Sequence, residues 1–482
     1  MLRRGRIAPL GSAALCVLAL GAAGSPPASA QLGGDECLSA GPPPLNAPAH
    51  RLRFGITPLL AGSAGVSQSQ PKPENKSAAL SALQRLRPGR RQLVLRLNRM
   101  SMADGVAGIR RYAALVDRYA KAGFASELQV RYHPGPGQEG DMAAWRSYVT
   151  SAAAILGKRP SVKALTITNE ANFPVSPNTS DGSFAGVRQA IVTGILAARK
   201  ELDRIGRPDV ELGFSFAWRW LPSSDADFWR QLGTLGSAEF RQAVDYVGLQ
   251  IYPHLVYPPA PLPGRMAGDE MVEALTLLRN CYMPQAGLGG NVGLWVTENG
   301  YPTNLGRTED SQVTELATTL DAIHRYSGAL GVTDYRWFNL RDNDSTGTDL
   351  FDAVGLLRDD YSEKPAFAAL RTAIDQLGTD RPRTRRCANR VATIIGTNHR
   401  DRLRGGSGPD VIFAGRGADK VTGHGGADLI CGGPGPDRLR GGPGRDALIG
   451  GPGGDRLIGG AGRDRCPHLQ IVDRARSCNR GG

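Results

Sequence analysis

The 482-residue sequence predicts an α/β protein in which a (β/α)8 TIM barrel is followed by a parallel β-roll of nonapeptide repeats. Eight β-type segments recur along residues 51–378, roughly 35 to 47 residues apart, with amphipathic or alanine-rich stretches between them. Beyond residue 395, aspartate recurs every nine residues, usually with an apolar residue two places after it. The first pattern is typical of strands that alternate with helices, and the second of a solenoid of short repeats.

The N-terminal segment 1–30 has the three parts of a signal peptide. A basic start, MLRRGR, precedes an apolar run, and Ala28-Ser29-Ala30 forms a small-residue cleavage site before Gln31. Residues 31–50 form a Gly/Pro-rich lead-in to the barrel. No later stretch is long and apolar enough to span a bilayer. The sequence therefore predicts a secreted, extracellular protein without a membrane span.

Six cysteines remain after removal of the signal peptide: Cys37, Cys281, Cys387, Cys431, Cys466 and Cys478. An even number in an oxidising compartment favours disulfides, but six cysteines allow 15 connectivities and the sequence does not choose among them. We favour a Cys466–Cys478 bond because it would pin the last strand of the roll.

Polar residues gather where the expected barrel strands end. The strands are expected at 51–58, 92–98, 127–133, 163–170, 210–218, 245–253, 293–300 and 333–340. Strands of such a barrel are buried on both sides, so they carry polar residues at their C-terminal ends, where an active site opens. The polar or aromatic residues at these ends are Arg96, Asn98, His133, Asn169, Glu170, Tyr252, Glu298, Asn299, Trp337 and Asn339.

Two carboxylates dominate this rim. Glu170 ends the fourth strand in TITNEAN, and Glu298 ends the seventh strand in WVTENGYPT, so the two face each other across the barrel mouth. Cleavage of a glycosidic bond requires such a pair, because one carboxyl must hold a proton while the other stays ionised. Either glutamate alone could be a surface carboxylate, but the opposed pair favours catalysis.

These motifs resemble the clan A glycoside hydrolases, whose catalytic glutamates lie on barrel strands four and seven. The resemblance covers nearly all of 51–378, and its specific content is the Asn169-Glu170 pair and the TENGYP segment. It implies a retaining O-glycosyl hydrolase acting on β-linked poly- or oligosaccharides without a catalytic cofactor. In that mechanism Glu170 is the general acid/base and Glu298 is the nucleophile.

The same resemblance implies roles for four substrate-binding residues. Asn169 would hydrogen-bond the 2-hydroxyl of the sugar, and Trp337 would form an aromatic floor beneath it. Arg96 would keep the nucleophile ionised, with Asn98 as the alternative contact from strand two. The hydroxyl of Tyr252 would also touch the nucleophile.

Two histidines near the rim are less easily assigned. His133 could orient the substrate or merely cap strand three. Members of the clan often carry a histidine just before the strand-six tyrosine, whereas here His254 follows Tyr252 by two places, which puts the network around Glu298 in doubt. Further aromatic residues suit a polymeric substrate with several sugar platforms: Trp218, Trp220, Tyr257 and Tyr301.

The nonapeptide segment consists of glycine turns, aspartates and short strands, as in GGPGPDRLR, GGPGRDALI and GGPGGDRLI (432–458). Nine residues are too few for a helical repeat but suit half a turn of a β-roll with the apolar residue inward. The segment resembles the hemolysin-type (RTX) calcium-binding repeat over 396–466, between a linker at 379–395 and a C-terminal tail at 467–482. The expected calcium (Ca²⁺) ligands are Asp410, Asp419, Asp428, Asp437, Asp446 and Asp455, because the outermost units are expected to act as caps.

The basic charge of the chain belongs to its C-terminal part. Residues 379–482 hold 19 Lys+Arg against 10 Asp+Glu, whereas the whole chain has a net charge of +13. This charge favours attachment to an anionic cell-surface polymer, or it is simply a solvated face. We expect a carbohydrate polymer as substrate and no nucleic-acid partner. The alternative function is a non-catalytic, calcium-dependent glycan-binding or adhesive extracellular protein, although a binder would need neither glutamate.

Overall fold

The structure is a computed structural model, and the residues that it describes form fourteen ranges. They are 41–45, 49–58, 72–89, 91–174, 177–218, 222–256, 263–289, 292–379, 386–388, 390–392, 394–396, 400–467, 469–470 and 473–478. The expected signal peptide, most of the lead-in, Cys37, Trp220 and Tyr257 lie outside these ranges. Within them, no helix combines the length and apolarity needed to cross a bilayer.

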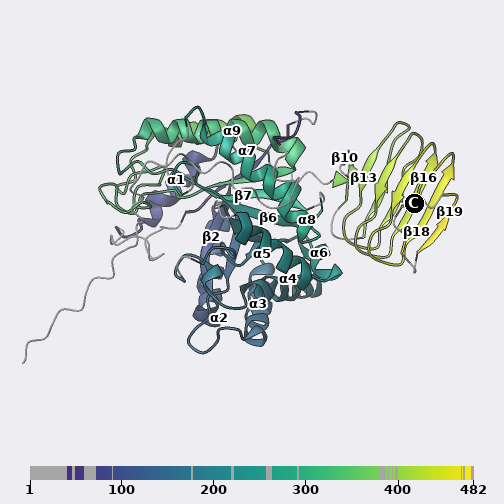
Figure 1. The fold of residues 1–482 in the computed structure, drawn as a ribbon, viewed down its shortest axis with the longest axis horizontal. Helices are drawn as coiled ribbons and strands as arrows, with labels where there is room; N and C mark the ends of the chain where they lie inside the picture. Colours follow the sequence, from purple (N-terminus) through teal and green to yellow (C-terminus); the bar gives the residue numbers. More distant parts are fainter. Residues whose placement is uncertain are drawn as a thin grey trace, which may run out of the picture. The chain divides into compact units, whose positions relative to one another are not determined.

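Eight parallel strands close into a barrel in chain order (Figure 1). They are β1 Arg53–Ile56, β2 Val94–Ser101, β3 Ala125–Arg131, β4 Val162–Ile167, β5 Glu211–Ala217, β6 Tyr246–Gln250, β7 Gly293–Asn299 and β8 Val332–Trp337. The helices between and after them are α1 Lys76–Leu86, α2 Gly105–Lys121, α3 Met142–Gly157, α4 Val187–Arg204, α5 Pro222–Leu235, α6 Ala238–Ala243, α7 Ala267–Leu277, α8 Met283–Gln285, α9 Glu309–Leu330 and α10 Pro365–Leu377. The predicted (β/α)8 barrel is confirmed.

Local sequence explains where these elements begin and end. All residues of β3, β5 and β7 are buried, as expected for strands covered on both faces. Polar caps start the helices: the Asn75 side chain accepts the Ala78 N–H before α1, and Thr308 accepts the Ser311 N–H before α9. Gly331 ends α9 at φ 68°, a conformation that glycine adopts without strain. Buried strands and capped helices therefore carry the barrel rim.

Seven charged side chains of alternating sign form a continuous series of ion pairs through the barrel interior, here called the axial ion chain. Its members in order are Glu211, Arg53, Asp334, Arg336, Glu127, Arg96 and Glu298. The N–O distances from Glu211 to Arg96 lie between 2.6 and 3.3 Å, and no member side chain is more than 9% exposed. Buried charges are tolerated when they are paired in this way.

The second part of the chain is a roll of two parallel sheets, with strand orders β11-β13-β15-β17 and β12-β14-β16-β18-β19 (Figure 1). Their bounds are β11 Ile394–Ile395, β12 Arg402–Arg404, β13 Val411–Phe413, β14 Lys420–Thr422, β15 Leu429–Cys431, β16 Arg438–Pro443, β17 Ala447–Ile449, β18 Arg456–Ala461 and β19 Arg474–Arg476. Paired residues are 18 apart, as in Val421 with Leu439, so one coil contains two nonapeptides. This confirms the predicted β-roll.

Apolar side chains fill the space between the two sheets, and glycines allow the coils to stack. The aliphatic residues that follow the aspartates, such as Ile430, Leu439 and Leu448, form one buried cluster. A Cβ atom on Gly435, whose φ is 133°, would lie 1.8 Å from the carbonyl oxygen of Gly417 one coil earlier. A side chain at this position would therefore separate the coils.

Strands also occur on either side of the expected repeat segment. β9 Arg386–Cys387 and β10 Arg390–Val391 form a small antiparallel pair, and β11 already belongs to the roll. At the other end, β19 pairs with β18, so the roll continues into residues expected to form a tail. Asp473 lies nine residues after Asp464 and accepts the Asp455 N–H, which makes it a further aspartate of the series.

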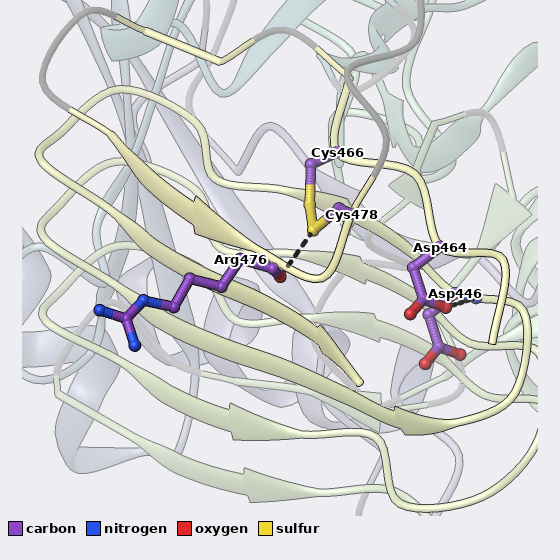
Figure 2. Close-up of a disulfide and its surroundings, with 5 residues drawn as sticks. All are labelled: Asp446, Asp464, Cys466, Arg476 and Cys478. Atoms are coloured by element: carbon purple, nitrogen blue, oxygen red, sulfur yellow. Dashed lines mark hydrogen bonds between the residues drawn. A yellow bond between two sulfur atoms is a disulfide. The ribbon is translucent and has the colours of Figure 1, made fainter. Parts of the chain in front are cut away.

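Two disulfides tie these end segments to the roll. Cys387 is bonded to Cys431, and Cys466 is bonded to Cys478, which confirms the expected pairing near the last strand (Figure 2). Cys281 of the barrel is disulfide-bonded as well. Each roll disulfide joins a residue outside the regular repeats to one inside them, and so holds a terminal segment against the sheets.

Candidate active site and calcium-binding loops

Glu298, near the end of β7, is held by two hydrogen-bond donors. Arg96 Nη1 donates to Glu298 Oε1, and the Tyr252 hydroxyl donates to Glu298 Oε2 over 2.9 Å. Burial, together with the negative charges of Glu298 and Glu170, raises the pKa of Tyr252 well above its ordinary value, so the phenol keeps its proton. The Glu298 carboxyl group thus faces a buried guanidinium and a phenol, and both donate hydrogen bonds to it.

Glu170 lies in a strained turn just after β4. Thr168 and Glu170 both have positive φ values, 70° and 45°, in a region that side-chain-bearing residues rarely adopt. Buried hydrogen bonds hold the turn: the Asp181 carboxylate accepts the Asn169 N–H at 2.8 Å, and Ser215 Oγ accepts the Glu170 N–H at 3.1 Å. Strain that is held in this way is typical of functional sites.

The surroundings of Glu170 favour its protonated form. Burial and the nearby charge of Glu298 together raise the pKa of Glu170 to about 7. The Ser180 hydroxyl donates to Glu170 Oε2 over 2.5 Å, and this hydrogen bond acts to lower the Glu170 pKa. The rim therefore contains one carboxyl that can carry a proton near neutral pH and one that is surrounded by donors to its ionised form.

Replacing Ser180 by alanine is expected to move the basic limb of the pH dependence of kcat/KM to higher pH. The Ser180 hydroxyl stabilises ionised Glu170, so its loss raises the Glu170 pKa above about 7 and keeps the acid protonated over a wider range. Ser183→Ala, in the 3₁₀ turn Asp181–Ser183 that begins just after Ser180, is the matched control. A basic limb that stays in place or moves to lower pH in Ser180→Ala would contradict this role.

The Asn169 amide is oriented by three buried partners. Its Oδ1 accepts from Gln129 Nε2 at 2.5 Å and from Gln250 Nε2 at 2.7 Å, while its Nδ2 donates to the Thr179 carbonyl at 2.6 Å. Among the described residues, its second N–H has no hydrogen-bond partner. Sequence reasoning missed Gln129 and Gln250, although polar side chains in buried strands are a signal for such a role.

The structure places the other expected site residues as follows. Trp337 ends β8, is 1% exposed, and its Nε1 has no hydrogen-bond partner among the described residues. His133 is half-buried with its ring 5.0 Å from that of Phe184, and burial, assisted by the Arg131 charge, lowers its pKa. Arg96, and not Asn98, is the residue of β2 that contacts Glu298.

His254 belongs to a separate buried cluster. Its Nδ1 lies 2.8 Å from Glu315 Oε1, and its Nε2 lies 3.4 Å from Glu270 Oε1. Burial acts to lower its pKa, but the bonds to the two glutamates outweigh burial and raise the pKa of His254 to about 9. The histidine that follows Tyr252 therefore belongs to an ion cluster with Glu270 and Glu315. Glu298 is held by Arg96 and Tyr252 instead.

In the roll, each central aspartate uses one carboxylate oxygen and leaves the other without a partner. Oδ1 accepts the backbone N–H of the aspartate one coil earlier, as Asp464 does from Asp446 at 2.9 Å (Figure 2). The buried Oδ2 atoms without a hydrogen-bond partner among the described residues are those of Asp419, Asp428, Asp437, Asp446, Asp455 and Asp464. Buried carboxylate oxygens of this kind require a proton or a cation.

This donor set fits calcium. Burial raises the pKa of Asp437 to about 8 and those of Asp419, Asp446 and Asp455 to about 6, because it disfavours the charged carboxylate. Among the described residues no three acidic, histidine or cysteine side chains are arranged to hold a metal ion together. The other ligands of a cation at these aspartates would be backbone carbonyls and waters. Asp410 differs, because its Oδ2 accepts the Gly406 N–H at 2.6 Å. Asp464, which was expected to lie in a capping unit, resembles the central aspartates, because its Oδ2 also has no hydrogen-bond partner among the described residues.

The fold and its two sites define a TIM barrel with two glutamates at its rim, joined to a roll of aspartate-bearing turns. Residues 395–430 and 432–466 match the family model described as the RTX calcium-binding nonapeptide repeat, present in four copies. This part of the chain consists of RTX repeats.

The barrel is similar in fold to several solved glycoside hydrolases. A GH5_18 structure from Streptomyces cattleya in complex with GlcNAc is 15% identical, with a TM-score of 0.49 over 74% of this chain and 85% of that one. A family 1 β-glucosidase from Thermotoga maritima is 12% identical, with a TM-score of 0.46 over 71% of this chain and 100% of that one. No curated protein matches the chain.

Proposed function

We propose that the protein is a secreted, retaining glycoside hydrolase that cleaves β-linked poly- or oligosaccharides. The observation that carries the proposal is the opposite environment of the two rim carboxyls. Glu298 receives hydrogen bonds from Arg96 and Tyr252, whereas burial and the Glu298 charge raise the pKa of Glu170 to about 7. A carboxylate and a carboxylic acid on the same rim are the two groups that glycoside hydrolysis needs.

In the proposed mechanism, Glu298 attacks the anomeric carbon while Glu170 gives its proton to the departing glycosidic oxygen. The glycosidic bond breaks and an ester bond between Glu298 and the sugar forms. Glu170, now ionised, takes a proton from water, and the resulting hydroxyl displaces Glu298 to release the sugar with its original configuration. The second Asn169 N–H would bind the 2-hydroxyl, and Trp337 would contact the sugar at the end of β8.

The RTX roll is proposed to stabilise the secreted protein or attach it to a surface. Disulfides, a signal-peptide-like N-terminus and calcium-binding repeats all suit an extracellular location. Bound calcium would add positive charge to an already basic segment, which suits an anionic cell-surface polymer.

The test is to incubate the mature protein, with calcium, with a panel of β-linked polysaccharides and to record proton NMR spectra of the first products. We expect reducing ends that appear first as the β-anomer. Azide should restore turnover to Glu298→Ala and give the α-glycosyl azide, because the small anion occupies the space of the missing carboxylate. First products of inverted configuration would exclude the retaining mechanism. Calcium-dependent binding of a glycan without its cleavage would favour the alternative, a glycan-binding protein.

A further inference from the structure

A cavity of about 410 Å³ opens at the barrel rim, where β8, β1 and β2 end. These strands are neighbours in the closed barrel, and Pro58, Arg99 and Leu340, at or just beyond their ends, line the cavity. The cavity wall also contains the rings of Tyr112 and Tyr361. Its position and its mixture of rings and polar groups suit a sugar unit next to the one that is cleaved.

Three arginines, Arg99, Arg111 and Arg341, give the cavity wall a positive charge. The wall contains two carboxylates, and both are already engaged. Asp104 pairs with Arg111 at 2.8 Å, and Glu74 pairs with Arg118, which lies outside the wall, at 3.2 Å. Among the described residues of the wall, three guanidinium groups therefore accompany two carboxylates.

Arg341 brings a buried cation to the cavity. It is 3% exposed, and its two Nη atoms donate to the backbone carbonyls of Asp359 and Lys72. The Tyr361 ring lies 4.9 Å from the guanidinium carbon, and Nε has no hydrogen-bond partner among the described residues. Among the ion pairs formed by those residues, none includes Arg341. Its charge is thus balanced by dipoles, which leaves it able to attract an anion.

Arg99 links the cavity electrostatically to Glu298. It lies near the C-terminal end of strand β2 and has a φ of 76°. This conformation costs energy for any side-chain-bearing residue and persists only where the surroundings impose it. Burial lowers the pKa of Arg99, the Arg131 charge acts in the same direction, and the Glu298 charge acts against them. Arg99 is thus within electrostatic reach of both the nucleophile and a second cation.

We propose that this cavity is a subsite for an anionic group on the sugar chain, namely the carboxylate of a uronic acid. The inference rests on the proposed hydrolase function and names its substrate class, an acidic β-linked polysaccharide. A guanidinium presents parallel N–H groups that match a planar carboxylate, and the tyrosine rings offer apolar faces to the sugar ring. A sulfate ester shares the negative charge but not the planar shape.

The test is isothermal titration calorimetry of the full chain carrying Glu170→Gln, which binds without turnover. The probes are β-1,4-glucuronan and β-1,4-mannuronan tetramers, the neutral cello- and mannotetraose of the same linkages, and sulfated cellotetraose. We expect at least one uronate probe to bind about tenfold tighter than its neutral counterpart, with an affinity that falls as salt is added.

Combining Arg111→Gln or Arg99→Gln with Glu170→Gln should reduce the affinity for the uronate probe about tenfold and leave the affinity for the neutral probe unchanged. Arg110→Gln, on the adjacent exposed position of α2 outside the cavity wall, is the matched control and should change neither. Arg111 is exposed as well, so its variant should fold normally. Equal binding of uronate and neutral probes, or equal losses in Arg110→Gln and Arg111→Gln, would overturn the proposal. Tightest binding of the sulfated probe would overturn the uronate assignment.

The same experiment separates this inference from the proposed function. If the protein binds a uronate probe in a charge-dependent way but the wild type cleaves no substrate, the subsite proposal is supported and the hydrolase proposal is contradicted. If the wild type cleaves neutral polysaccharides but the protein binds charged and neutral probes equally, only the subsite proposal is contradicted.

Discussion

Glu298→Gln is expected to lose about 10³-fold or more in kcat while the protein stays folded. The amide cannot form the ester with the sugar, so the covalent step disappears. The fold should persist because Arg96, the buried cation that loses its carboxylate partner, still pairs with Glu127 at 3.3 Å. Steady-state kinetics on a cleaved polysaccharide, together with circular dichroism to verify the fold, provide the measurement.

The matched control for this variant is Glu273→Gln, a partly exposed glutamate of α7 that pairs with Arg265 and with no member of the axial ion chain. It should retain wild-type kinetics, because an exposed ion pair contributes little. Wild-type-like turnover in Glu298→Gln would end the assignment of the nucleophile. A Glu273→Gln variant as inactive as Glu298→Gln would show that the loss has another cause.

Removing calcium is expected to open the roll and leave the barrel intact. Without a cation, buried Oδ2 atoms without partners lie in consecutive coils, and the glycine-rich turns gain much entropy on unfolding. Limited proteolysis of the full chain should cut within 400–476 in a chelator and spare this region in excess calcium. Magnesium should protect poorly, because it keeps its waters and demands a tight octahedral shell.

Asp437→Asn, in the middle of the roll, should require more calcium for the same protection because it removes one anionic ligand. Asp375→Asn, an exposed residue of α10 in the barrel, should leave the calcium requirement unchanged. Equal protease resistance of the roll in chelator and in calcium would refute calcium-coupled folding.

The sequence predicted the barrel well because each strand combines an apolar run with a polar C-terminal end. Glu170 and Glu298 were visible for the same reason. Ser180 and Asp181 were not, since they lie in a loop whose path back to Glu170 and Asn169 depends on tertiary structure. Glu127 was equally hidden: it looks like the polar start of a strand, and its arginine partners come from β2 and β8.

The roll was predicted from its period, but its ends were not. Asp473 continues the nine-residue spacing without a glycine turn before it, so the pattern seemed to end at Asp464. β11 lacks an aspartate two residues before it and falls in the expected linker. Terminal coils need only pair on one side, and they therefore depart from the repeat that identifies the inner ones.

The axial ion chain restricts how this protein can change during evolution. Losing one charge would leave each buried neighbour of opposite sign with one partner fewer. Where no partner within the axial ion chain remains, as for Glu211 without Arg53, the cost is typically about 3–5 kcal/mol, whereas exchanging a whole pair for apolar residues can be nearly neutral. Substitutions along the chain should therefore be accepted in pairs. Since Glu298 is its last member, the residues tolerated at Arg53 and Glu211, at the far end of the barrel, depend on a carboxylate that they do not touch. Selection that preserves Glu298 as the nucleophile would therefore also constrain the residues accepted at Arg53 and Glu211.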